Sequence, residues 1–385
     1  MCCTFAENRM HMDNPFILEP YKSKELFCDR EEETARLVDC LINGRNTTLI
    51  SARRLGKTGL IYRTFDEIKD RKLPYDTFYV DISSSQNIDD FVKLLTESVA
   101  SVLTTQNRIK DFFSSLKGIR PLLGFDSVNN TPSISFSYQT MAEKQQTIKS
   151  VLSFLEKNKR PVILAIDEFQ QVREYPDVHM EAVLRTYIQP LHNVRFIFCG
   201  SKKHTMTDMF TNALKPFYES TTNIPISTLN PTVYAAFIEK QFQKAGKKIS
   251  KEYIDEIIVW TRDYTFYTQS LCNEVFQQSA SIVNDEDIRK SKEIILTSNR
   301  DRFLEIQRLI TPSQWKLMKA IAKDGSVQHP TSSDFIQRNH LSSGPAVLKN
   351  LKTLIDKELI LANNTENGIS YSVYNVFLSR YLELL

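Results

Sequence analysis

The sequence of 385 residues has no long hydrophobic run, no C-x-x-C cysteine pair and little glycine. No apolar stretch approaches the roughly 18 residues that a membrane-spanning helix needs, and the first residues lack the apolar core of a signal peptide. The 6 cysteines and 6 histidines are scattered, which argues against a zinc site and against a disulfide framework. We therefore expect a cytoplasmic protein that makes no membrane contact.

Neither sign of charge dominates the sequence. Lys and Arg number 49 and Asp and Glu 46, for a net charge of +3, so charge alone does not predict nucleic-acid binding. The hydrophobic fraction of 41% and the charged fraction of 25% are ordinary for a globular protein with a sizeable core. At about 100–200 residues per domain, the length predicts two or three domains.

Strands alternate with helical patterns over residues 13–226, after a segment, residues 1–12, that we expect to be disordered. The run Pro161–Ile166 is continuously apolar, as a central parallel strand should be, and Arg195–Cys199 repeats that character. Between the strands, apolar residues recur at helical spacing. The alternation predicts an α/β fold with a parallel sheet covered by helices on both faces.

The segment 118–140 interrupts this alternation. It contains glycine, proline and asparagine, and apolar residues then alternate with serines from Ser133 to Tyr138. This pattern predicts an inserted hairpin on the surface, with a long flexible loop as the alternative.

From residue 227 onward the parallel-sheet pattern stops. Residues 227–308 predict a helical domain, and its last segment predicts one helix over residues 285–310. Residues 309–385 contain two short helices joined by a turn and then two β-rich runs around a polar tip, Asn363–Gly368. That order predicts a helix-turn-helix followed by a wing, which together form a winged-helix domain.

A phosphate-binding loop is predicted at Gly56-Lys57-Thr58, in the frame S-A-R-R-L-G-K-T between a strand and a helix. Loop and helix N–H groups would point at phosphate oxygens, Lys57 would lie between the β- and γ-phosphates, and Thr58 would offer its hydroxyl to Mg²⁺. Ser51 replaces the usual first glycine, and a chance G-K-T on a surface turn is the alternative. The predicted nucleotide-binding residues of the loop are Ser51, Ala52, Arg53, Arg54, Leu55, Gly56, Lys57, Thr58 and Gly59.

A second motif, V-I-L-A-I-D-E, ends an apolar strand in adjacent carboxylates. Asp167 would hold Mg²⁺, directly or through water, and Glu168 would polarise the attacking water. The alternative is an acidic strand end that caps the next helix. The following strand ends at Ser201, and because neighbouring parallel strands end at one edge of the sheet, Ser201 would touch the γ-phosphate or orient water; a simple turn is the alternative there.

These motifs resemble the archaeal-type ATPase family, in the STAND branch of AAA+-related P-loop proteins. The resemblance spans nearly the whole chain and implies an AAA+-like ATPase core, a helical lid at 227–308 and a C-terminal winged helix. It also implies that the segment carrying Phe16, Phe27 and Arg30 helps to enclose adenine. The sequence departs from the family before its Tyr-x-Gln motif, where Asp263-Tyr264-Thr265 replaces Gly-His-Pro. The resemblance rests on Asn14-Pro15-Phe16, Phe27-x-x-Arg30-Glu31, Arg53-Arg54-x-Gly56-Lys57-Thr58, Ile166-Asp167-Glu168-Phe169-Gln170, Gly200-Ser201 and Tyr267-x-Gln269.

The leading functional hypothesis is a slow, Mg²⁺-dependent ATPase that acts as a nucleotide-controlled switch, with ATP and ADP as its ligands. The alternative is a DNA-binding regulator in which the nucleotide is structural. Residues 311–385 hold 8 Lys or Arg and 6 Asp or Glu, which is only weakly basic, and Lys349 and Lys352 would lie on the recognition helix. A winged helix that contacts a protein partner, a second copy or the lid is a further alternative. A nucleoside kinase is weaker, because it needs an acceptor pocket.

Overall fold

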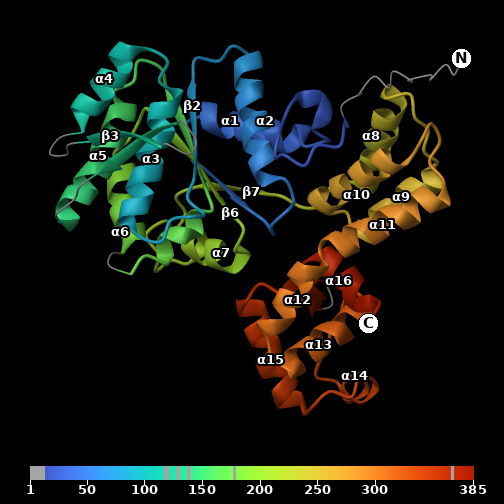
Figure 1. Ribbon diagram of the computed structural model, residues 1–385. Helices are drawn as coiled ribbons and strands as arrows, with labels where there is room; N and C mark the ends of the chain where they lie inside the picture. Colours follow the sequence, from blue (N-terminus) through green and yellow to red (C-terminus); the bar gives the residue numbers. More distant parts are fainter. Residues whose placement is uncertain (1–13, 117–120, 127–130, 137–139, 177–178, 366–367) are drawn as a thin grey trace, which may run out of the picture. The chain divides into compact units, whose positions relative to one another are not determined.

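The computed structural model describes residues 14–116, 121–126, 131–136, 140–176, 179–365 and 368–385 (Figure 1). The predicted disordered segment 1–12 lies outside these residues. The chain divides into two compact units, one over Glu19–Thr228 and one that joins the described residues before Glu19 to Leu229–Leu385. The boundary between Thr228 and Leu229 falls close to the predicted change from the α/β domain to the helical domain at residues 226–227. Residues 14–18, which we had assigned to the α/β domain, belong instead to the helical unit.

The first unit is built on a sheet of five parallel strands in the order β2-β5-β6-β1-β7. All six residues of β5 are buried, because helices cover both faces of a central parallel strand. The predicted α/β fold class is confirmed. The strands are β1 Thr47–Ile50, β2 Asp76–Asp81, β5 Val162–Asp167, β6 Val194–Gly200 and β7 Thr222–Pro225.

Alternate residues of the central strands face the two helical layers. Leu164 and Phe196 belong to a core shared with residues of α3 and α5. The helices α1 and α2 pack against each other away from α3 and α5 (Figure 1). The helices of this unit are η1 Lys24–Leu26, α1 Glu31–Ile42, α2 Lys57–Asp70, α3 Ile88–Val102, α4 Gln106–Ser115, α5 Met141–Glu156, η2 Phe169–Arg173, α6 Met180–Ile188 and α7 Lys203–Thr211. An antiparallel hairpin of β3, Pro121–Asp126, and β4, Thr131–Phe136, occupies part of the segment 118–140.

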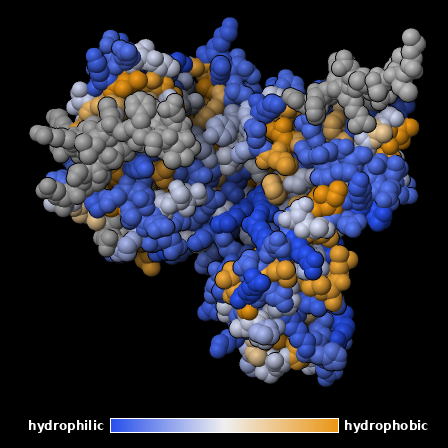
Figure 2. Space-filling model, in the orientation of Figure 1, coloured by the Kyte–Doolittle hydropathy of each residue, from blue (hydrophilic) through white to orange (hydrophobic). Residues whose placement is uncertain are grey.

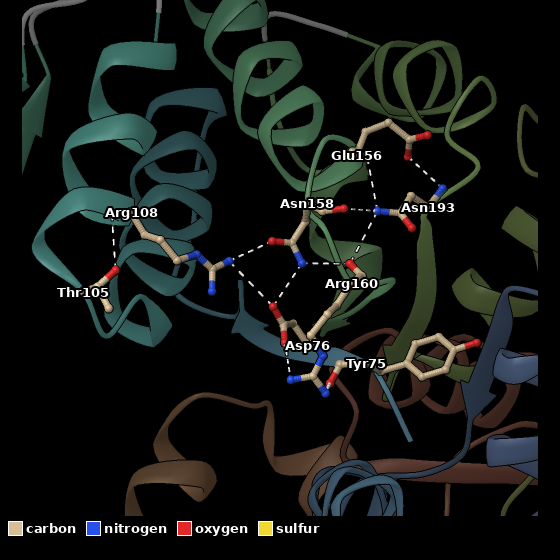
Figure 3. A network of polar contacts seen from close by, with 8 residues as sticks. All are labelled: Tyr75, Asp76, Thr105, Arg108, Glu156, Asn158, Arg160 and Asn193. Atoms are coloured by element: carbon tan, nitrogen blue, oxygen red, sulfur yellow. Dashed lines mark hydrogen bonds and ion pairs between the residues drawn. The ribbon is translucent and has the colours of Figure 1, made fainter. Parts of the chain in front are cut away.

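A polar network ties the amino ends of the sheet strands together (Figure 3). Asp76, the first residue of β2, accepts a hydrogen bond from Asn158 Nδ2 at 3.0 Å and pairs with Arg160 Nη1 at 3.3 Å and Arg108 Nη2 at 3.6 Å. Asn193 Nδ2, just before β6, donates to the carbonyl of Asn158 at 2.8 Å. Three strands are therefore joined at the edge of the sheet opposite to the phosphate loop.

Removing the centre of this network should destabilise the α/β unit. We expect Asp76→Ala to cost about 1–3 kcal/mol, because it removes one acceptor from each of two guanidinium groups and one side-chain amide. Far-UV circular dichroism during urea unfolding is the suitable measurement, since both tryptophans, Trp260 and Trp315, lie in the other unit. The exposed Asp70, replaced by Ala, is the control and should cost less than about 0.5 kcal/mol. Equal costs for the two variants would contradict the assigned role.

The second unit begins as a helical bundle. Phe16 is fully buried there, with its ring 5.1 Å from that of Phe242 and 6.1 Å from that of Phe276. Asn14 Nδ2 donates to the carbonyl of Asn273 at 2.9 Å, and Asn273 Nδ2 donates back to the carbonyl of Phe16 at 2.6 Å. These contacts explain why the segment before Glu19 joins this unit. The helices are α8 Pro231–Lys244, α9 Lys251–Thr261, α10 Thr265–Gln278, α11 Asp285–Ser298 and α12 Arg300–Arg308.

The single helix predicted over 285–310 is wrong, because it breaks at Asn299. Its side-chain amide donates to the carbonyl of Ile295 at 2.8 Å, competing locally with the helical backbone pattern. Beyond it stand α13 Pro312–Lys323, α14 Ser333–Arg338, α15 Gly344–Asp356, the antiparallel strands β8 Ile360–Thr365 and β9 Gly368–Val373, and α16 Val376–Glu383.

The surface agrees with the composition. The face in Figure 2 is mainly hydrophilic, with hydrophobic side chains in scattered groups. Among the residues that the structure describes, no helix is long and apolar enough to cross a membrane.

Candidate functional site

The loop between β1 and α2 closes around a buried ammonium group. Lys57, only 6% exposed, donates from Nζ to the carbonyls of Ser51 at 3.1 Å and Ala52 at 3.0 Å. Arg54 and Gly56 have φ of 69° and 87°, and this left-handed backbone gives the loop its curvature. A Cβ at Gly56 would meet no atom within 4 Å, so its backbone conformation rather than crowding favours glycine there.

Serine at position 51 fits the loop without opening it. The residue is 3% exposed, and its Oγ donates to the carbonyl of Ala52 at 3.2 Å. The first glycine of the usual motif is therefore replaced by a residue that stays inside the turn. A cationic group held by converging carbonyls, at the start of a helix, is suited to bind a polyphosphate.

Asp167, at the carboxyl end of β5, receives three hydrogen bonds. Its Oδ2 accepts from Thr58 Oγ1 at 2.7 Å and from the Tyr79 hydroxyl at 3.0 Å, and its Oδ1 accepts from the N–H of Glu168 at 2.9 Å. Burial, and next the charge of Asp167, raise the pKa of Tyr79, so this hydroxyl stays protonated and donates. Thr58, in the first turn of α2, is thus hydrogen-bonded directly to the strand that carries the paired carboxylates.

Glu168 is held by the neighbouring strand end. Its Oε2 accepts from Ser201 Oγ at 2.6 Å and from Gln170 Nε2 at 2.5 Å, and Arg53 Nε donates to Ser201 Oγ at 3.2 Å. Glu168 has left-handed backbone angles, φ 55° and ψ 40°, at the point where β5 ends and η2 begins. The structure therefore brings together the loop, the paired carboxylates and Ser201 at one edge of the sheet.

Gly200 permits this arrangement by its lack of a side chain. A Cβ there would lie 2.3 Å from Gln170 Oε1 and 2.6 Å from Met206 Sδ. Our sequence analysis missed Gln170 and Tyr79 as partners of the two carboxylates. Tyr79 reaches Asp167 because β2 pairs with β5 in a register that sets Asp81 opposite Asp167, and the sequence alone does not specify that register.

The segment before α1 packs against the phosphate loop. A Cβ at Gly59 would lie 2.5 Å from the carbonyl oxygen of Pro20 and 2.8 Å from the ring of Phe27, so only glycine admits this contact. Arg30 is buried, and its Nη2 donates to the carbonyl of Ser227 at 2.5 Å and to that of Leu55 at 3.5 Å. Arg30 therefore braces the loop. Phe16, by contrast, lies in the other unit with its ring against two phenylalanines.

Two arginines that lie near the site motifs in the sequence form ion pairs or hydrogen bonds with other parts of the structure. Arg173 pairs with Glu181 at 3.0 Å and with Asp208 at 2.8 Å. Arg195 donates to the carbonyl of Val194 at 3.0 Å, within the early part of β6. Both guanidinium groups have structural partners away from Glu168.

The hard oxygen groups at the site fit magnesium better than a softer metal. The described residues hold no cluster of three or more His, Cys, Asp or Glu side chains with metal-binding geometry. Mg²⁺ does not need such a cluster, since it usually binds one or two protein oxygens together with phosphates and water. The Thr58 hydroxyl and the Asp167 carboxylate, 2.7 Å apart, are a suitable pair.

Comparison with known proteins identifies the same architecture. A family model described as a probable winged helix domain matches residues 301–384. No curated protein sequence matches the chain. The Walker-type ATPase of Pyrococcus abyssi is similar in structure, with 17% identity, a TM-score of 0.67 and coverage of 96% of this chain and 99% of that one.

Two proteins of Aeropyrum pernix are similar over 96% of this chain and 96% of their own, each at 12% identity. They are the ORC2 protein in ADPNP-ADP complexes, with a TM-score of 0.59, and the ORC1 protein in complex with DNA, with a TM-score of 0.54. At these identities the likeness shows the fold alone. That fold, a P-loop ATPase sheet followed by helices and a C-terminal winged helix, is the one that the sequence motifs predicted.

Proposed function

We propose that this protein binds ATP with Mg²⁺, hydrolyses it slowly and acts as a nucleotide-controlled switch in the cytoplasm. The observation that carries the proposal is the 2.7 Å hydrogen bond from Thr58, in the phosphate loop, to Asp167, on β5. It joins the group that would hold the phosphates to the group that would hold the metal. The fold shared with P-loop ATPases supports the same activity.

Different residues of the site would bind the phosphates and the metal ion. Backbone N–H groups of residues 51–59 and the Lys57 ammonium would bind the β- and γ-phosphates, exchanging the carbonyl contacts of Lys57 for phosphate oxygens. Thr58 and Asp167 would hold Mg²⁺, which neutralises charge on the phosphates when bound. Tyr79 would keep the Asp167 carboxylate oriented by its hydrogen bond.

Glu168 would act as the general base. It would accept a proton from the water that attacks the γ-phosphate, yielding ADP and phosphate. Ser201 is bonded to one oxygen of this carboxylate, so its part would be to orient Glu168 rather than to react. Phe27, packed beside the first turn of α2, is the residue of the preceding segment that we propose to contact adenine.

One experiment tests this proposal directly. Phosphate release by the purified full chain is measured with ATP and Mg²⁺, with and without duplex DNA, against Glu168→Gln. We expect Mg²⁺-dependent turnover in the wild-type protein that chelation removes and the variant largely lacks. Absence of both turnover and nucleotide binding would overturn the proposal.

A second candidate function is DNA binding by the winged helix, and the arrangement of α14, α15 and the β8–β9 wing favours it. The similar ORC1 structure is a complex with DNA. Lys349 and Lys352 are exposed on α15, the position of a recognition helix. Leu348, 59% exposed beside them, fits a protein contact better than a phosphate.

The double variant Lys349→Ala/Lys352→Ala tests this second function. If α15 reads DNA, we expect weaker duplex binding and a salt dependence flatter by about two units, at roughly 0.9 per phosphate contact. Fluorescence anisotropy over a salt series is the measurement. The exposed pair Lys69 and Lys93, replaced in the same way, carries an equal charge change outside the winged helix and should leave the slope unchanged. If wild type binds no duplex at low salt, DNA binding is overturned and the winged helix is better regarded as a protein-contact or autoinhibitory domain.

A further inference from the structure

Arg53 lies in the middle of the phosphate loop, and its hydrogen bond leads to the proposed general base. Its Nε donates to Ser201 Oγ at 3.2 Å, and Ser201 Oγ donates to Glu168 Oε2 at 2.6 Å. Arg53 is exposed, so its guanidinium group is accessible to a ligand bound in the loop. Its guanidinium is thus one hydroxyl away from the carboxylate of Glu168.

The order of the strands explains this convergence. β6 lies between β1, which leads into the loop, and β5, which ends at Asp167. Ser201, just after β6, therefore stands between Arg53 on one side and Glu168 on the other. A general base must lie within reach of the water that attacks the terminal phosphate. A cation bonded through Ser201 to that base consequently lies at the γ-phosphate end of the site and not at the adenine end.

We propose that Arg53 binds the γ-phosphate within its own chain and lets the site distinguish a nucleoside triphosphate from a diphosphate. This inference rests on the proposed function. Guanidinium groups suit the task because their planar array of donors matches phosphate oxygens and stays charged at every physiological pH. With a triphosphate bound, Arg53 contacts the γ-phosphate; with a diphosphate, it returns to Ser201.

The other arginines near the site make poorer candidates. Arg173 is committed to Glu181 and Asp208, and Arg195 to the backbone of β6. Arg71, whose side chain is 43% exposed just after the last turn of α2, supplies a matched control outside the loop. Arg71→Gln removes the same charge at the end of that helix farther from the loop.

Isothermal titration calorimetry with Mg²⁺ tests the inference, using a non-hydrolysable ATP analogue and ADP. For Arg53→Gln we expect at least about 10-fold weaker binding of the analogue, the effect of one charge-assisted hydrogen bond, and less than about 3-fold weaker binding of ADP. Arg71→Gln should keep the wild-type ratio of the two affinities. Arg53→Lys, which keeps the charge but not the planar fork, should recover part of the loss.

The outcomes separate this inference from the function on which it rests. If wild type binds neither nucleotide, both are overturned. If wild type binds both and Arg53→Gln keeps the wild-type ratio, only the role of Arg53 is overturned. The same follows if Arg71→Gln shifts the ratio as much as Arg53→Gln, since the effect would then be one of general charge. ADP binding by each variant also shows that its site is folded.

Discussion

Replacement of Lys57 by alanine is expected to abolish ATP binding. The ammonium is buried and held by two loop carbonyls at 3.0 and 3.1 Å, in the place where phosphate oxygens would enter. Two charge-assisted hydrogen bonds to phosphate, at about 1.5–3 kcal/mol each, correspond to a loss of at least about 100-fold in affinity. Calorimetry with Mg²⁺ and ATP measures the effect.

Lys69→Ala is the matched control for this prediction. Lys69 lies in the last turn of the same helix, α2, and is exposed, so its loss removes the same charge far from the loop. The control should bind ATP as wild type does. Circular dichroism must show that Lys57→Ala is folded, because the variant leaves two carbonyls without their donor. Unchanged nucleotide affinity in a folded Lys57→Ala protein would remove the central claim of the proposed function.

The parts of the fold that sequence patterns predicted are those that depend on local periodicity. β5 was predictable because a strand covered on both faces is a nearly continuous apolar run; its first five residues are apolar, and all six, including the terminal Asp167, are buried. The phosphate loop was predictable because Gly56, Lys57 and Thr58 stand at fixed spacing between a strand and a helix. The winged helix was predictable from the succession of a helix pair and a polar-tipped hairpin.

The missed parts depend on register and on side-chain direction. Tyr79 meets Asp167 only because β2 and β5 pair in one particular register, which a single sequence does not specify. The sequence shows Phe16 near a motif, but it does not show in which unit the side chain packs. The rings that Phe16 contacts lie more than 220 residues away along the chain. The apolar spacing of the predicted helix continues past Asn299, but the helix ends there. The Asn299 side chain donates a hydrogen bond to the backbone and competes with the helical pattern.

Glu168→Gln is expected to keep nucleotide binding and to slow hydrolysis by at least about 10-fold, within the roughly 10²–10⁴ typical of a general base. Glutamine has the same shape, and its carbonyl oxygen can still accept the hydrogen bonds from Ser201 and Gln170. What it loses is the capacity to take a proton from water. The arrangement should therefore survive while the chemical step fails, which calorimetry and phosphate release measure separately.

The controls for this variant distinguish the base from its surroundings. Glu174→Gln changes the same charge at a carboxylate that is 54% exposed and pairs with Lys202, so it should turn over at the wild-type rate. Ser201→Ala should slow hydrolysis less than Glu168→Gln, because it removes an orienting bond and leaves the carboxylate. Wild-type turnover in Glu168→Gln would reassign the residue to the turn before η2. The structure already weakens that alternative, since the Glu168 side chain makes no capping hydrogen bond to η2.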